Sequence, residues 1–337
     1  MSRLRTVFFG SPAFAVPCLR AVAAATELRA VVSQPDRPAG RGQAPAPPAV
    51  KQAAQALGVP VLQPEKVRTP DTAAALAAFQ ADLFVVVAYG RILPQALLDL
   101  PRLGPYNVHA SVLPRLRGAA PIQWAIIRGE SETGVSIMRM EAGLDTGPVA
   151  AVRRLPIADD DTTGTLSGKL SALGAELLVA TLLAIASGEV QLRPQDDAAA
   201  TLAPPLTKAD GVLRWELPAR LVSAQARGVD PWPGATTTLN GEPLKLFAPR
   251  VVEPGELRQL LAAVDVPVSV LVTPKAPPVP QLAELGVSRI SVGGAIAVAS
   301  YGFAVAAVKQ LRDQGTPNYW DAAAAVRDDM TAAFVTP

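Results

Sequence analysis

The stretch Thr6-Val7-Phe8-Phe9, which ends at Gly10-Ser11-Pro12, decides the fold of the first part of the chain. It is a short apolar run, and the Ala-rich stretch 14–25 that follows repeats its apolar residues at helical spacing. The same succession of strand and helix recurs up to a second apolar run at 83–88. Continuous apolar strands that alternate with helices are typical of a parallel sheet covered on both faces. The sequence therefore predicts an α/β domain.

The expected elements of this domain extend to residue 187. Strands are expected at 6–9, 28–33, 59–62, 83–88, 106–109, 135–140 and 149–157, and helices at 14–25, 49–57, 72–79, 122–128 and 163–187. The last helix has a threonine of N-cap type at position 162 and a closing glycine at position 188. Together the elements predict a Rossmann-like, doubly wound and mostly parallel sheet.

Two further regions follow this domain. Polar residues and prolines dominate 191–205, so we place a domain boundary there and predict a first domain at 1–205. Residues 206–251 form a small β-rich domain, because Asn240-Gly241 stands between two alternating runs in the manner of a hairpin turn. The tail, 252–337, returns to βα texture, with strands expected at 266–272 and 287–292 and helices at 281–285 and 295–313.

Composition restricts the classes of site and partner. A chain of 337 residues is too long for one ordinary domain. The single cysteine, Cys18, excludes an internal disulfide, and with a single histidine the chain lacks the ligands of a Cys/His zinc site. A net charge of +2 gives a weak overall field, so a nucleic-acid partner would need a local basic patch. The first apolar run breaks at Gly10, and we expect no signal peptide, membrane-spanning helix or membrane partner.

Polar side chains end the predicted strand at 106–109. Because strand residues alternate between faces, Asn107 and His109 point into the same space, at the sheet edge where open parallel sheets bind ligands. Asp145 lies in the Gly-rich loop 143–147 and is able to pair with His109. Each residue also has a simpler interpretation: Asn107 as a strand-end cap, His109 as an ordinary core or surface residue, and Asp145 as a turn residue.

The sequence around these residues resembles the signature of folate-dependent formyltransferases. The matching stretches are 107–115, 117–123 and Gly143-Leu144-Asp145-Thr146-Gly147. By this resemblance, Asn107, His109 and Asp145 occupy the catalytic positions. The amide and the imidazole would stabilise the oxyanion of the tetrahedral intermediate, and the carboxylate would pair with the imidazole and pass a proton through water.

The resemblance also implies where the formyl donor, 10-formyltetrahydrofolate, binds, with no metal required. Ser111-Val112-Leu113-Pro114 matches the stretch that lines the folate site, with valine in place of the usual leucine. Tyr89-Gly90-Arg91-Ile92 matches the loop whose backbone meets the pterin ring. A strand-to-helix turn is the simpler interpretation of that loop, and it is compatible with folate binding.

The stretch 34–42 resembles the insertion that distinguishes the tRNA-acting members. Arg37 and Arg41 lie in this Gly/Pro-rich loop, and Lys51 follows it. All three cations are expected to contact phosphates near the acceptor end of a tRNA. The simpler interpretation is a solvated surface loop. The implied reaction is transfer of the formyl group to the methionine amino group of initiator tRNA, which serves translation initiation in the cytoplasm.

The resemblance changes in the second half of the chain. It continues through 230–234 and 241–245, and members normally complete a small OB-like barrel there. Residues 253–315 instead resemble the carboxy-terminal end of the isocitrate lyase and phosphoenolpyruvate mutase superfamily, whose reactive strands are absent from this chain. We therefore expect an incomplete OB-like domain followed by an atypical α/β tail.

Three alternatives remain open at this point. A related formyltransferase would act on another acceptor, such as a nucleotide sugar or a purine precursor. A formyl-folate hydrolase would release formate without an acceptor, and an inactive fusion protein would bind RNA without chemistry. The partners expected on the favoured interpretation are a reduced folate and initiator methionyl-tRNA, with the protein acting as a monomer.

Overall fold

The computed structural model describes residues 3–39, 44–239, 242–246, 254–263, 269–271, 276–291 and 307–315. Contacts divide the chain into two units, residues 1–248 and 249–337. The predicted start of the tail at 252 lies close to this division. The predicted boundary at 205 lies inside the first unit, and the three-domain division stays a prediction.

A sheet with the strand order β5-β2-β1-β6-β7-β8-β9 forms the centre of the first unit. The first five strands of this order run parallel, and β8 and β9 are antiparallel additions at one edge. The strands are β1 (Arg5–Gly10), β2 (Glu27–Val32), β5 (Val61–Leu62), β6 (Leu83–Val87), β7 (Pro105–His109), β8 (Glu132–Arg139) and β9 (Val149–Pro156). The prediction of a mostly parallel α/β sheet is confirmed.

Helices cover both faces of this sheet. They are α1 (Val16–Ala25), α2 (Ala49–Ala56), α3 (Pro70–Ala77), α4 (Gln95–Leu98), α5 (Pro121–Ile127) and α6 (Thr163–Ser187), whereas α7 (Ala219–Gly228) packs on α5. Phe8 of β1 packs into the core shared with α1, α2, α5 and α6, whereas Val7 and Phe9 pack into the opposite core with α3 and α4. Successive strand residues thus enter different cores, which explains why the strand is apolar throughout.

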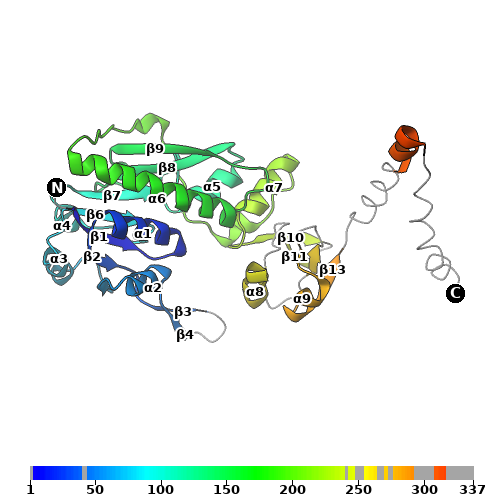
Figure 1. The fold of residues 1–337 in the computed structure, drawn as a ribbon, viewed down its shortest axis with the longest axis horizontal. Coiled ribbons are helices and arrows are strands. Elements are labelled where there is room, and N and C mark those ends of the chain that lie inside the picture. Colours follow the sequence, from blue (N-terminus) through cyan, green and yellow to red (C-terminus); the bar gives the residue numbers. More distant parts are fainter. Residues whose placement is uncertain are drawn as a thin grey trace. The chain divides into compact units, whose positions relative to one another are not determined.

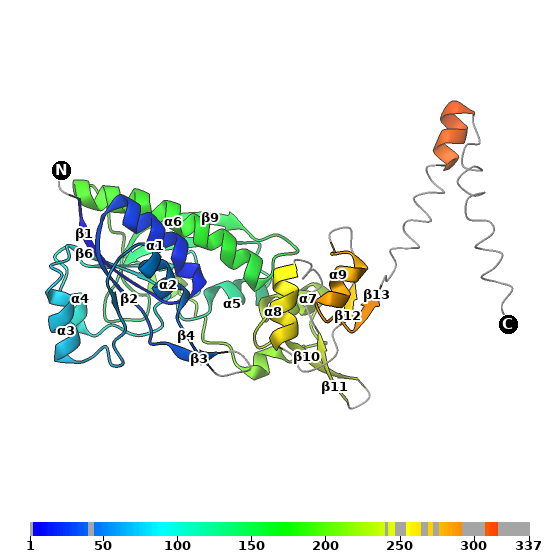
Figure 2. The same cartoon turned by 60° about the horizontal axis from the view of Figure 1, so that its bottom comes forward.

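The long helix α6 begins and ends where the sequence predicts. Thr162 and Thr165 cap each other's backbone N–H groups at its start, and Gly188 ends it in a left-handed conformation with φ of 76°. Figures 1 and 2 show α6 running alongside α1. Within the described residues it is the one helix long and apolar enough to cross a membrane. Because Leu166, Leu170 and Leu178 lie fully buried in the core, we interpret it as a core helix.

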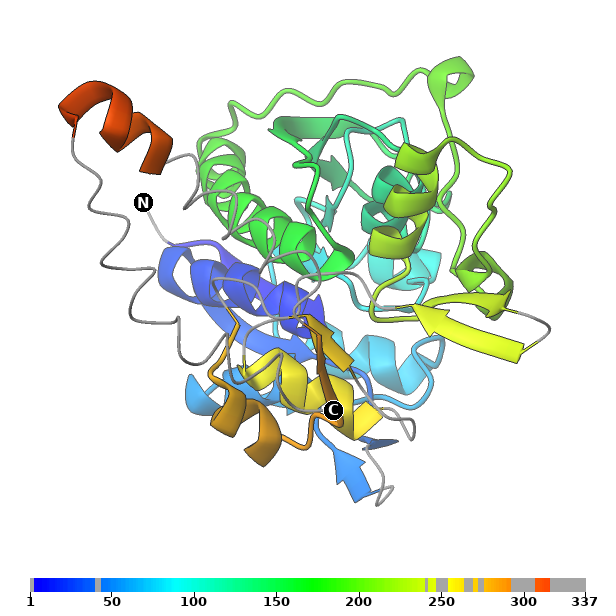
Figure 3. The same cartoon turned by 90° about the vertical axis from the view of Figure 1, so that its right-hand side faces the viewer.

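The first unit contains one further helix and two short antiparallel strand pairs. Figure 3 shows α7 beside α5, and their shared core includes Ile127, Leu213 and Val222. The antiparallel pair β10 (Ala235–Leu239) and β11 (Glu242–Leu246) confirms the predicted hairpin, although its Asn240-Gly241 turn lies outside the described residues. A short antiparallel pair, β3 (Arg37–Ala39) and β4 (Ala44–Ala46), was not predicted. The OB-like character of 206–251 stays a prediction.

The second unit contains α8 (Pro254–Ala263), β12 (Ser269–Leu271), α9 (Val279–Glu284), β13 (Arg289–Ser291) and a helical segment at 307–314. The strands β12 and β13 pair in parallel. Leu257, Val270 and Leu282 are its buried apolar residues among those described. The predicted order of strand, helix and strand is therefore present, whereas most of the predicted helix at 295–313 lies outside the described residues.

Candidate active site

The last strand of the parallel part of the sheet, β7, carries the two polar residues singled out from the sequence. Tyr106 and Val108 pack into the core formed with α1 and α6, so Asn107 and His109 lie on the other face. His109 is paired with Ser136 of β8, and only 5% of its side chain is exposed. The sheet therefore fixes the histidine at the carboxyl end of its strand.

Both ring nitrogens of His109 face an acceptor. Its Nε2 lies 2.9 Å from the carbonyl oxygen of Leu116, in the loop that follows β7. Its Nδ1 lies 3.6 Å from Oδ2 of Asp145, which is the pairing expected from the sequence. Leu116 has φ of 59°, and this left-handed turn directs the following chain back across the strand end.

Asp145 is held in a tight loop. Its φ is 54°, a left-handed conformation that glycine, asparagine and aspartate adopt most readily, and its side chain is 12% exposed. Its Oδ2 accepts a hydrogen bond of 2.8 Å from the backbone N–H of Gly118. A Cβ at Gly147 would overlap the carbonyl oxygen of Arg139, so this position requires glycine. The loop therefore places one carboxylate oxygen between the histidine and a backbone donor.

Asn107 is half-buried on β7, between Val86 of β6 and Met138 of β8. Among the described residues, its side-chain amide makes no hydrogen bond that would commit it. An amide supplies two N–H donors, and a side chain that remains partly exposed is able to offer them to a ligand. Asn107 is therefore the uncommitted donor of the three predicted residues.

The stretch 111–114 is fastened to the sheet. The hydroxyl of Ser111 donates 2.6 Å to the carbonyl of Arg115, and the hydroxyl of Ser136 joins the Ser111 carbonyl to the Leu113 N–H. Leu113 is buried beside Met138. Because the Ser111 hydroxyl is already used within the loop, backbone and apolar groups are what this stretch offers to a folate.

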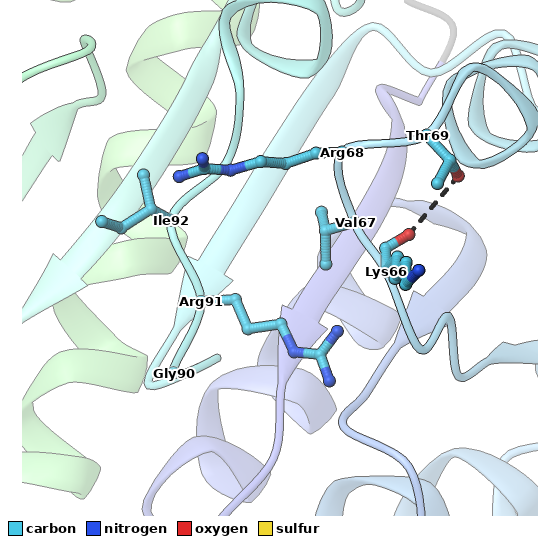
Figure 4. A pocket seen from close by; sticks show the side chains of 7 residues that line it. All are labelled: Lys66, Val67, Arg68, Thr69, Gly90, Arg91 and Ile92. Carbon is cyan, nitrogen blue, oxygen red and sulfur yellow. Dashed lines mark hydrogen bonds between the residues drawn. The ribbon is translucent and has the colours of Figure 1, made fainter.

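Figure 4 shows a surface hollow of about 590 Å³, which the loop after β6 lines with Gly90, Arg91 and Ile92. The guanidinium of Arg91 is turned back onto Oε1 of Gln34 at 2.9 Å and onto the carbonyls of Pro64 and Glu65. Ile92 is 63% exposed at the rim. Tyr89 does not line this hollow, because its ring is buried edge-on against Phe9. The same burial raises the pKa of its hydroxyl.

The other wall of the hollow was not predicted. Lys66, Val67, Arg68 and Thr69 line it, and they follow β5 at the same edge of the sheet as the Arg91 loop. Two cations shortly after a strand of a parallel sheet are the signal that would have found them. The hollow is therefore a basic one, with an apolar floor supplied in part by Val67.

Comparison with known proteins supplies the family. The profile described as "Formyl transferase" matches residues 4–182, and that of the "Formyl transferase, C-terminal domain" matches 205–267. A methionyl-tRNA formyltransferase from Sorangium cellulosum is 54% identical over 248 residues, which cover 74% of this chain and 80% of that relative. The chain belongs to the formyl transferase family. A third profile, "Phosphoenolpyruvate phosphomutase", matches 244–312, in agreement with the resemblance expected for the tail.

Solved structures agree with this family at the level of the fold. A sugar N-formyltransferase from a Shewanella species superimposes with a TM-score of 0.57 at 17% identity, covering 74% of this chain and 99% of that one. HypX from Aquifex aeolicus in complex with tetrahydrofolic acid gives a TM-score of 0.53 at 18% identity, over 73% of this chain and 38% of that one. The formyl transferase sheet described above is therefore the one these proteins share.

The loop predicted to contact tRNA is partly visible in this formyl transferase. Arg37 is exposed at the start of β3, whereas Arg41 lies outside the described residues. Lys51 is bound to the carboxylate of Asp36 at 2.7 and 2.9 Å. Hydrogen bonds from Gln63 and then Lys51 lower the pKa of Asp36. The charge of Lys51 is thus already compensated, and Arg37 is the cation presented to solvent.

Two further kinds of candidate group were considered among the residues that the structure describes: the free thiol and clusters of metal-ligating side chains. Burial raises the pKa of the Cys18 thiol to about 12, so this side chain is an inert core residue. In the part of the chain that the structure describes, no three His, Cys, Asp or Glu side chains gather as a metal site would require.

Proposed function

We propose that this chain transfers the formyl group of 10-formyltetrahydrofolate to the methionine amino group of initiator methionyl-tRNA. The relative that is 54% identical to it is named methionyl-tRNA formyltransferase, and HypX, which shares its fold, binds tetrahydrofolic acid. The observation that carries the proposal is the position of His109. It stands between the Leu116 carbonyl and the Asp145 carboxylate at the end of a parallel strand, with Asn107 on the same face.

The reaction asks for few groups from the protein. The amine nitrogen forms a bond with the formyl carbon, and the bond from that carbon to the folate nitrogen then breaks. The proton lost by the amine replaces the formyl group on the folate nitrogen, so the products are the formylated aminoacyl-tRNA and tetrahydrofolate. Between these two steps the formyl oxygen carries negative charge, which needs hydrogen-bond donors.

Asn107 and His109 supply those donors, and Asp145 assists the proton transfer. The amide of Asn107 is available as the structure stands. The Nε2 of His109 is hydrogen-bonded to Leu116, so this bond has to be exchanged for the oxyanion when substrates bind. The carboxylate of Asp145, 3.6 Å from Nδ1, keeps the ring oriented during this exchange. Its negative charge stabilises positive charge that develops on the groups beside it. Donors of this kind are each worth about 10²–10³ in rate.

The substrates have candidate sites on the same unit. The basic hollow beside Gly90 and Arg91, together with the stretch 111–114, is where we place the folate. Arg37, with Arg41 of the same loop, is suited to the phosphates of the tRNA, and Lys51 would join them only by leaving Asp36. We further propose that the enzyme acts as a monomer in the cytoplasm and needs no metal ion.

The direct test is transfer of labelled formyl from 10-formyltetrahydrofolate to charged initiator tRNA, with uncharged initiator and charged elongator tRNAs as controls. We expect label on charged initiator tRNA alone. Formate release that does not require an aminoacylated tRNA would indicate a hydrolase instead. Transfer to an amino sugar nucleotide in preference to the tRNA would indicate another acceptor, and the absence of any formyl chemistry would leave only a binding role.

A further inference from the structure

The polar segment at 193–204, here called the linker, passes over both loops of the candidate active site. Arg193 exchanges two backbone hydrogen bonds, of 2.8 and 2.9 Å, with Val149 just after the Asp145 loop. Further on, Thr201 accepts hydrogen bonds from the N–H groups of Leu116 and Arg117. The linker is therefore fastened to the loop that supplies the aspartate and to the loop that supplies the histidine's carbonyl partner.

Gln195 is the one linker side chain that connects the two loops directly, among the residues described. Its amide Nε2 donates to the carbonyl of Asp145 at 2.8 Å and to the carbonyl of Gly147 at 2.7 Å. Its Oε1 accepts from Nε and Nη2 of Arg117, at 3.0 and 2.8 Å. Both N–H groups and the carbonyl oxygen of this amide are thus used. The N–H groups bind the Asp145 loop, and the oxygen binds Arg117.

Arg117 determines which way this amide points. A guanidinium has donors only, so it must face Oε1, and the two N–H groups of Gln195 are then directed at the Asp145 loop. Arg117 is 7% exposed and also bonds Asp197 at 2.8 Å, so it is itself fixed. The next residue, Gly118, donates its N–H to the Asp145 carboxylate. Arg117 and Gly118 therefore hold both the backbone and the side chain of the aspartate.

The Asp145 loop is held in place by these bonds. Its φ of 54° is a left-handed conformation, which aspartate adopts more readily than most residues and which the hydrogen bonds to the loop fix here. Releasing the two carbonyls would let the backbone relax and carry the carboxylate away from His109. At 3.6 Å the pair is an electrostatic contact, so its strength depends on where the loop holds the carboxylate.

We propose that Gln195 is a positioning residue, which acts through Asp145 on the orientation of His109. In this proposal Gln195 itself contacts neither substrate. The kinetic part of this inference rests on the proposed function, whereas the structural part does not, because His109 is the single histidine of the chain and gives one set of ring resonances. The two parts are therefore separable by experiment.

The test uses the full chain with Gln195→Glu, which keeps the acceptor for Arg117 and removes both donors to the loop. We expect kcat to fall about 10-fold, as for a small misplacement of a reacting group, while KM for folate and tRNA changes less than about twofold. Tm falls by no more than several degrees, because the two carbonyls lose their donor while the Arg117 contact remains. Asp196→Ala, which removes an exposed neighbouring carboxylate bonded to Ala198, is the matched control and leaves kcat unchanged.

Two further measurements decide between positioning and a merely structural role. In protein labelled with ¹³C-histidine and carrying no histidine tag, Gln195→Glu shifts the His109 ring resonances and Asp196→Ala does not. In an Asp145→Asn background, Gln195→Glu costs less than about twofold in kcat, because the group through which it acts is already altered. The full 10-fold loss in that background, or unchanged resonances, would overturn the proposal. An inactive wild type would refute the proposed function, and the resonances would still decide the role of Gln195.

Discussion

The sheet of the first unit and the β12–β13 pair of the second arise from the same kind of sequence pattern. In both, apolar strands alternate with helices, and parallel pairing joins β12 to β13 as it joins the first five strands of the larger sheet. The first sheet has helices on two faces and two separate apolar cores. In the described part of the second unit, the apolar core consists of the buried residues Leu257, Val270 and Leu282. A βα pattern therefore predicts where strands and helices form. Whether they enclose a site depends on how many strands join the same sheet.

The largest effect should come from the only imidazole. We expect His109→Ala to lower kcat by about 10²–10³ or more, because an oxyanion donor and the partner of Asp145 are both lost. Transfer of labelled formyl to initiator methionyl-tRNA measures the rate. His109→Gln, which fills most of the same buried space, separates lost chemistry from a packing defect. Near-normal rates in both variants would show that His109 of β7 is not part of the active site.

A second change should affect the tail alone. Leu282 is fully buried in the second unit, and Leu282→Ala should destabilise that unit by about 2–5 kcal/mol, which its small core is unable to offset. Hydrogen exchange across 254–291 should then accelerate while formyl transfer stays within about twofold. Val279→Ala, at an exposed position of the same helix, is the control. A parallel loss of activity would mean that the two units depend on each other.

A third change should affect the sheet alone and should depend on pH. Asp82 is buried, and hydrogen bonds from Arg5 first, with a further one from Arg102, hold its pKa well below the usual range. A depressed pKa stabilises the folded state fully above the unfolded value of about 4, and this contribution is lost as the pH falls through the folded value.

Asp82→Asn should therefore lower the free energy of unfolding by about 1–3 kcal/mol at pH 7. The difference from the wild type should narrow below about pH 4. Urea denaturation at several pH values measures it, and Asp71→Asn, at an exposed carboxylate, is the control. A difference that widens in acid would show that the Asp82 carboxylate is not stabilised by its two arginines.

The smallest effect is expected from the largest deletion. A chain that ends at Arg250 retains the whole of the first unit, including the hollow and the His109 loop. We expect its affinity for folate to remain within about twofold of the full chain, as measured by titration calorimetry. A large loss of folate affinity would mean that the second unit contributes to the site, and the contrast between the two regions would no longer hold.

The positions of the main elements were predictable because they depend on local periodicity. The limits of α6, set by Thr162 and Gly188, and the shared face of Asn107 and His109 follow from helix capping and from the period of a strand. Short elements were missed. The strands β3 and β4 lie in a Pro-rich stretch whose pairing has no periodic signal, and α4 is only four residues long.

The pairing of His109 with Asp145 was also within reach of the sequence, because the motif resemblance named both. Their environment was not. The carbonyl of Leu116 at Nε2, the amide of Gln195 beneath Asp145 and the carboxylate of Asp36 on Lys51 all join residues whose meeting depends on the path of the chain. The sequence predicted Lys51 as a tRNA contact, and the structure gives it an acidic partner that such a contact must displace.

By itself, the sequence determined the doubly wound sheet and the family, and it named the three polar residues that we propose for formyl transfer. Hydrophobic periodicity and a long position-specific motif carry that information, and both are properties of neighbouring residues. Tertiary structure alone decided which acceptors flank the imidazole and which linker side chain supports the aspartate. Hydrogen bonds such as that between Leu116 and Thr201, which are 85 residues apart, form only where the fold brings donor and acceptor within about 3 Å.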